Sequence, residues 1–229
     1  MQNAHEMPVT VSEKINEFIQ KRRKPLFISV AAVLLILVIC IAGISLMDVF
    51  RERAITEVEG LNTRYGTLSS ITDTGDSERA QLLEDLEVFA QKNSGVIFPS
   101  YAGGRAWAII GTIYGEQEQW AQAETAWTNA AQVARKTYLA PIAFFNAGAA
   151  AEEQGRTEAA IAHYANSISP DFPASPRAQF AIGRLRESLH DRSAAMEAYR
   201  AVISGWPQDS AWVNLAHSRI IALEMPGNE

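Results

Sequence analysis

The longest apolar segment of the chain is 26–47, which has 22 residues and no charged side chain. About 20 apolar residues span the roughly 30 Å hydrocarbon core of a bilayer. The segment is longer than the roughly 7–15-residue apolar core of a cleaved signal peptide. A buried core helix is the alternative, but no side of this segment is polar enough to face water. The pattern predicts an uncleaved membrane-spanning signal anchor.

Basic residues lie mainly on one side of this segment. The cluster KRRK occupies 21–24, whereas Arg51 and Arg53 on the far side stand next to acidic residues. Loops rich in Lys and Arg stay in the cytoplasm. We therefore expect 1–25 to be a cytoplasmic tail and 48–229 to lie outside the cytoplasm. In a Gram-negative-type cell this means a single-pass inner-membrane protein with a periplasmic domain.

Apolar residues also recur at helical spacing just ahead of the anchor, at Val11, Ile15, Phe18 and Ile19. This spacing predicts a short amphipathic helix at the cytoplasmic surface. Lipid, a protein partner and solvent all remain open as its surroundings.

Beyond residue 95, small and large apolar residues recur with a long period. Gly111, Gly148 and Gly183 are 37 and 35 residues apart, and an alanine follows each glycine by 12 residues. A fixed offset of this kind is typical of repeated supersecondary units. We expect each unit to be a pair of antiparallel helices, with the glycine in the first and the alanine in the second.

The glycine needs a packing reason, because glycine inside a helix costs roughly 1 kcal/mol relative to alanine. Trp107, Ile110 and Tyr114 share a helix face around Gly111, so apolar periodicity continues on both sides of it. A helix end is therefore an unsuitable explanation for this glycine. We expect it to allow the second helix of the unit to approach closely, with large aromatic residues beside the crossing.

The first unit reads Trp107-x2-Ile110-Gly111-x2-Tyr114, then Ala123-x3-Trp127. It resembles the tetratricopeptide repeat (TPR), whose pattern is W-x2-L-G-x2-Y followed by A-x3-F. The later units depart from this pattern. Their substitutions are Ala151 for the tyrosine in the second unit, and Gln179 and Arg186 for the tryptophan and tyrosine in the third. The loop 169–175 also carries two prolines. Ser175 is expected to cap the helix that begins at Pro176.

The fold class predicted is all-α: one N-terminal transmembrane helix followed by a TPR-like solenoid of helical hairpins. The domains expected are 1–25 (cytoplasmic tail), 26–47 (anchor), 48–94 (juxtamembrane helix and degenerate first helical pair), 95–224 (repeat array with a capping helix) and 225–229 (tail). Within 48–94, a loop is expected at 72–78 and a helix at 80–93. The capping helix, 209–224, is expected to present an apolar face to the array at Trp212, Leu215, Ala216, Ile220 and Leu223.

Charge and chemistry narrow the function. The net charge is −6 for the chain and −8 beyond residue 25, which argues against nucleic-acid binding. The single cysteine, Cys40, cannot form an internal disulfide. The four histidines have no partners at metal-ligand spacing, and neither a phosphate-binding loop nor a catalytic carboxylate pair stands out. We expect no metal, no cofactor and no enzymatic activity.

The resemblance implies a protein-binding groove lined by the first helix of each unit. The family's groove-facing pattern falls here on Arg105, Thr112, Glu116, Phe145, Asn146, Glu152, Arg177, Phe180, Arg184, Glu187, Asn214 and Ser218. The two phenylalanines could equally belong to the core. Chaperone-tail-binding members of the family grip a terminal carboxylate with Lys and Asn, but Ala108 and Thr112 stand at matching positions here.

The whole architecture, including the charged segment EKINEFIQKRRK before the anchor, is similar to the ancillary Sec translocon subunit family of membrane-anchored bacterial TPR proteins. This resemblance implies a scaffold that helps secreted proteins to fold or hands them over near the translocon. Its partners would be proteins or peptides, among them translocon subunits or periplasmic chaperones. The alternative is a structural component of a cell-envelope assembly complex.

Overall fold

The computed structural model describes residues 11–70, 76–95 and 100–225, and helices but no strands occur in these ranges. The all-helical prediction is therefore confirmed for the described residues. The chain divides into two units, Met1–Glu52 and Arg53–Glu229, which are described separately here.

The first unit contains the beginning of helix α1 (Val11–Ser70). Its backbone is non-helical at Arg22, with φ −120° and ψ 18°, and Pro25 follows inside the helix. Proline lacks an N–H and its ring clashes with the carbonyl four residues earlier, which explains the kink. The Ser29 hydroxyl donates to the Pro25 carbonyl at 2.9 Å. Past this point, α1 is long and apolar enough to cross a membrane, and its apolar window is not buried by any part of the described structure.

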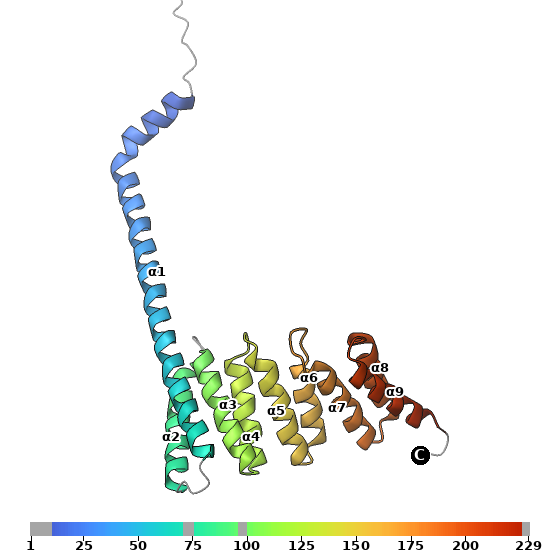
Figure 1. Cartoon of the computed structure of the whole chain (residues 1–229). Helices are drawn as coiled ribbons and strands as arrows, with labels where there is room; N and C mark the ends of the chain where they lie inside the picture. Colours follow the sequence, from blue (N-terminus) through green and yellow to red (C-terminus); the bar gives the residue numbers. More distant parts are fainter. Residues whose placement is uncertain (1–10, 71–75, 96–99, 226–229) are drawn as a thin grey trace, which may run out of the picture. The chain divides into compact units, whose positions relative to one another are not determined.

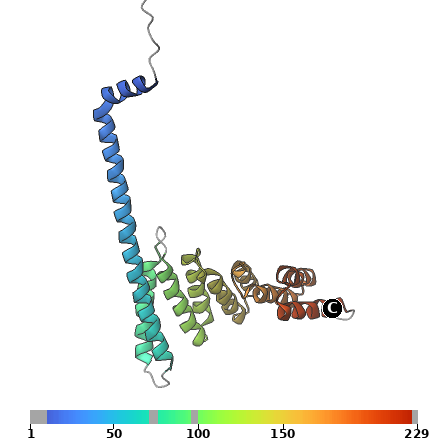
Figure 2. The same ribbon diagram turned by 45° about the horizontal axis from the view of Figure 1, so that its top comes forward.

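The second unit begins with the rest of α1, from Arg53, and continues as a row of helices that follow one another in chain order (Figures 1 and 2). These are α2 (Asp76–Asn93), α3 (Tyr101–Glu116), α4 (Trp120–Val133), α5 (Leu139–Glu153), α6 (Thr157–Ser167), α7 (Ser175–Ser188), α8 (Arg192–Gly205) and α9 (Ser210–Glu224). The loop expected at 72–78 is helical from Asp76, and 71–75 lies outside the described residues.

The turns inside the three hairpins are equivalent. Glu118, Gly155 and His190 have φ of 56°, 69° and 59°, and each follows its repeat glycine by seven residues. A left-handed residue just past a helix end lets the chain reverse with its last carbonyls satisfied. Glycine adopts this conformation readily, so Gly155 marks its turn in the sequence, whereas Glu118 carries no such signal.

An aromatic ring lies directly against each repeat glycine. A methyl group added at Gly111 would come within 2.8 Å of the Trp127 ring. The same addition at Gly148 would meet the Tyr164 ring at 2.8 Å, and at Gly183 the Tyr199 ring at 2.6 Å. The sequence predicted a close approach with aromatics beside it. The structure corrects this detail, because the ring itself occupies the space that the missing side chain leaves.

The final helix, α9, packs on α8 through its buried residues Ala216 and Leu223, with Trp212 and Ile220 partly buried against the same cluster. Leu215 was expected on this face, but the structure leaves it 47% exposed. It lies one residue before Ala216, so the helical turn of about 100° per residue carries it away from α8.

Candidate protein-binding groove

One face of α5 and one face of α7 border a common cavity of about 320 Å³. Phe145, Ala149 and Glu152 follow each other at spacings of four and three residues on α5, so they share a helix face. The other residues that line the cavity are Glu153, Tyr164, Arg177, Phe180, Ala181, Arg184 and Trp212. Five of the predicted groove residues, namely Phe145, Glu152, Arg177, Phe180 and Arg184, are thus brought together.

Aromatic contacts fix the walls of this cavity. The Phe145 ring centroid lies 5.3 Å from that of Tyr164, and the Arg177 guanidinium carbon lies 5.1 Å above the Phe145 ring. Phe180 lies 5.1 Å from Tyr199 and 5.4 Å from Trp212. The sequence left both phenylalanines between core and groove. Both rings are half-buried. Each packs on a tyrosine of the second helix, as a core residue does, and each also borders the cavity.

Two polar triads of the same residue types follow each other along the groove, the first joining the second repeat to the third and the second joining the third repeat to α9. Glu152 accepts from the Tyr164 hydroxyl at 3.2 Å and from Arg184 of the next repeat at 2.5 Å. The second triad consists of Glu187, which accepts from the Tyr199 hydroxyl at 3.0 Å, and Arg219, whose guanidinium donates to it.

All three members of the triad recur after 35 residues. The first repeat has Gly115, Trp127 and Ala149 at the equivalent positions and therefore lacks a triad. Arg184, Glu187 and Arg219 also border a second cavity of about 430 Å³, together with Phe180, Ser188 and Tyr199. The sequence suggested these charged groove residues as ligand contacts. The structure shows that Glu152, Arg184 and Glu187 bind other residues of the array instead.

Burial and the neighbouring carboxylates hold the triad tyrosines in their neutral form. Burial, followed by the hydrogen bond to Glu187 and its charge, raises the pKa of Tyr199 to about 12. Burial, followed by the charge of Glu152, raises the pKa of Tyr164 as well. In both cases ionisation would place a second negative charge beside a glutamate.

Two of the three predicted groove residues of the first repeat contact α1 instead of lining this cavity. The Arg105 Nε lies 3.5 Å from a Glu59 carboxylate oxygen, and Glu116 accepts from the Tyr65 hydroxyl at 2.5 Å. The Thr112 hydroxyl donates to the carbonyl of Ala108 in its own helix at 3.0 Å. The part of α1 that follows Arg53 therefore occupies this end of the array.

Three further predicted groove residues lie outside both cavities. These are Asn146, which is half-buried on α5, and Asn214 and Ser218, which are exposed on α9. The Ser218 hydroxyl donates to the Asn214 carbonyl at 2.9 Å. Sequence reasoning missed Ala149, Tyr164 and Arg219 as groove residues. The 35-residue offset from Arg184 was a usable signal for Arg219.

A separate polar cluster ties the first repeat to the second away from the groove residues. The buried carboxylate of Glu124 accepts from Gln154 at 2.8 Å and from Arg156 at 2.6 Å. The His163 Nε2 lies 3.1 Å from the other carboxylate oxygen. His163 thus has a packing role here. No group of three or more potential metal-ligating side chains occurs within the described residues.

The comparison with known proteins shows the family. No family model matches the chain. The chain is 31% identical over 230 residues to a TPR repeat-containing protein of Treponema pallidum (strain Nichols), covering 93% of this chain and 95% of that protein. At this identity and coverage the chain belongs to the TPR repeat-containing proteins. Proteins of this class act as protein–protein interaction scaffolds.

A solved structure of a Podosopora anserina kinesin light chain with nearly identical TPR-like repeats is also similar to the chain. Its TM-score is 0.46 at 11% identity, over 69% of this chain and 77% of that one. The family assignment rests on the sequence relative and on the chain's own repeats.

The triads predict a distinct response to alkali. Because the pKa of Tyr199 is raised in the folded chain to about 12, its stabilising effect is complete below its usual value near 10 and is lost as pH rises through about 12. Tyr199→Phe should lower the free energy of unfolding by about 1–2 kcal/mol at pH 8 through the lost hydrogen bond. It should also make the decline between pH 10 and 12 shallower, as measured by denaturant titration.

Thr125→Val is the control, since it removes an exposed hydroxyl that donates to the Ala121 carbonyl of its own helix at 2.9 Å and does not titrate in this range. It should change neither quantity appreciably. An unchanged slope in Tyr199→Phe would contradict the role assigned to the triad.

Proposed function

We propose that this protein is a membrane-anchored scaffold that binds segments of other proteins in the groove between α5, α7 and α9, on the extracytoplasmic side of the membrane. The observation that carries this proposal is the combination, in one chain, of an unburied apolar helix with a TPR array. The two parts suit a single role, because an interaction module on a membrane anchor concentrates its partners at the membrane surface.

The anchor is supported by the exposure of its side chains. From Phe27 to Leu46 the large apolar residues are half or more exposed, which is expected of a helix surrounded by lipid. The match to the T. pallidum relative leaves only about 16 residues of this chain outside it. The apolar segment begins 25 residues from the N-terminus, so the similarity extends through it.

The groove suits apolar side chains of an extended or helical peptide. Its cavity is bordered by four large aromatic side chains and Arg177, and aromatic residues and arginine dominate the energetics of protein interfaces. Of its two carboxylates, Glu152 is engaged by Tyr164 and Arg184 within the chain, and Glu153 is exposed. Recognition would therefore depend on apolar contacts, as expected for a protein that meets incompletely folded chains.

The resemblance to the ancillary Sec translocon subunits favours partners at the translocon or among periplasmic chaperones. The basic tail, single anchor and extracytoplasmic repeats all agree with that arrangement. A structural role in a cell-envelope assembly complex is the second candidate, because the same groove would serve a fixed partner equally well.

The orientation is tested by cysteine labelling in spheroplasts of a Gram-negative host. With Cys40→Ala as the background, Arg192→Cys places a thiol at an exposed site in the repeats, and Gln20→Cys places one before the anchor. A membrane-impermeant maleimide should label the Arg192→Cys protein in intact spheroplasts and the Gln20→Cys protein only after lysis. The reverse pattern would show that the repeats are cytoplasmic.

The groove is tested by cross-linking the full chain in intact cells, followed by purification in mild detergent and identification of the captured proteins. Arg177→Glu with Phe180→Ala should reduce capture roughly tenfold or more, because it removes two central contacts. Helicity by circular dichroism and membrane insertion should be retained.

Arg192→Glu is the control, since Arg192 is exposed and lines neither groove cavity. Capture of translocon subunits or chaperones would support the proposal, whereas capture of envelope-assembly proteins would favour the second candidate. Undiminished capture by the double variant would show that the groove is not the binding surface.

A further inference from the structure

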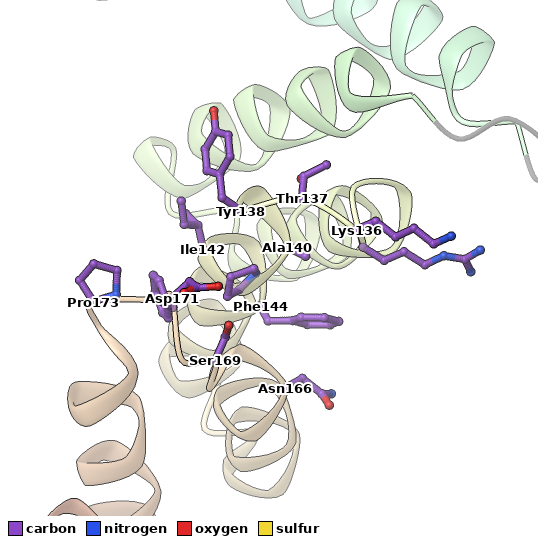
Figure 3. Close-up of a pocket in the computed structure, with 13 residues that line it drawn as sticks. Lys136, Thr137, Tyr138, Ala140, Ile142, Phe144, Asn166, Ser169, Asp171 and Pro173 are labelled. Carbon is purple, nitrogen blue, oxygen red and sulfur yellow. The ribbon is translucent and has the colours of Figure 1, made fainter. Parts of the chain in front are cut away.

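A larger cavity lies at the loop edge of the array, outside the groove defined above. Its volume is about 550 Å³, within the range of roughly 300–1,000 Å³ that ligand sites occupy. It lies between the start of α5 and the loop that leads to α7 (Figure 3). Its apolar lining includes Pro141, Ile142, Phe144, Phe172 and Pro173. We refer to it as the loop cavity.

The loop that borders this cavity is held in one shape by hydrogen bonds. The Ser175 hydroxyl donates to the Ser169 carbonyl at 2.8 Å and accepts from the Ser169 N–H at 3.0 Å. The Phe172 N–H donates to the same carbonyl at 3.1 Å. Ser175 was expected to cap α7, but Ala174 holds the cap position and the buried Ser175 closes the loop instead. A cavity wall of this kind is ordered before any ligand arrives.

The loop cavity adjoins the groove across one aromatic pair. Phe172 lines the loop cavity and lies 5.9 Å, edge-on, from Phe145, which lines the groove cavity. On α5, Pro141, Phe145 and Ala149 follow one another at intervals of four residues and so share one helix face. A peptide lying along this face would reach both cavities.

The surface formed by these two neighbouring cavities carries cations that are not neutralised. Arg135 and Lys136 are exposed at the loop cavity, and no ion pair involves either within the described part of the chain. Arg177, in the groove, lies over the Phe145 ring instead of a carboxylate. The acidic residues against these three cations are Asp171 in the loop cavity and the exposed Glu153 in the groove. This local excess of positive charge contrasts with the net charge of −8 beyond residue 25.

We infer that the loop cavity is a second contact site for the peptide that occupies the groove, and that this peptide is acidic, with an apolar side chain for the loop cavity and carboxylates for Arg135 and Lys136. The inference rests on the proposed function, because it assigns the chemistry of the same ligand. Aromatic and proline walls provide apolar area, and the adjacent cations select acidic sequences and speed their association.

The probe is a library of random twelve-residue peptides displayed on phage and selected on the full chain in detergent micelles. The most enriched peptide is then labelled with fluorescein, and its Kd is measured by anisotropy. We expect enriched peptides to carry Asp or Glu beside an aromatic or aliphatic residue. Arg135→Glu with Lys136→Glu should weaken binding roughly tenfold, and Asp171→Asn should strengthen it. Replacing the peptide's acidic residues with Asn and Gln should weaken binding to the unaltered chain.

Lys92→Glu with Arg192→Glu is the matched control, since it changes the net charge equally at two exposed sites outside both cavities. It should leave the Kd within about twofold, because exposed charges at a distance are screened. Binding that is lost with Arg177→Glu but unaffected at Arg135 and Lys136 would overturn the inference and leave the groove proposal standing. No enrichment above an empty-micelle surface would also overturn it, while the cross-linking experiment would still decide the groove.

Discussion

The repeat array depends on the contact between a glycine of the first helix and an aromatic ring of the second. At Gly111, Gly148 and Gly183 no side chain larger than hydrogen fits without displacing the ring. The ring is thereby held against the first helix, and in the second and third repeats the hydroxyl of the same residue reaches a glutamate on that helix. Packing inside each hairpin thus positions the polar contacts that line the groove.

Those polar contacts then connect one hairpin to the next. Glu152 on α5 and Glu187 on α7 each bind a tyrosine of their own repeat and an arginine two helices further on, on α7 and α9. Because these two carboxylates are satisfied within the chain, the groove offers a partner mainly aromatic surface, the cation of Arg177 and the exposed carboxylate of Glu153. An interaction scaffold with this lining is suited to apolar peptide segments, and the uncompensated charges at its loop edge would select among them.

The repeat framework could be predicted from the sequence, because its signal is local and periodic. The constant glycine-to-alanine offset was enough to predict the hairpins, and Gly155 marked a turn by its own chemistry. Other features depended on contacts between distant parts of the chain. Gly104 faces Ala134 at a close helix approach, yet two glycines at a helix start show no period. The pairing of Arg105 with Glu59 required knowing that α1 packs on α3.

The comparison of Gly111→Ala with Gly66→Ala, by thermal and denaturant unfolding of the full chain, tests the glycine–ring contact most directly. Both glycines lie inside helices, but a methyl group at Gly66 meets nothing within 4 Å, whereas one at Gly111 would overlap the Trp127 ring. Helix propensity should make Gly66→Ala neutral or up to about 1 kcal/mol more stable. Overpacking should make Gly111→Ala about 1–3 kcal/mol less stable. Equal stabilisation by both substitutions would contradict the glycine–ring contact as the basis of the array.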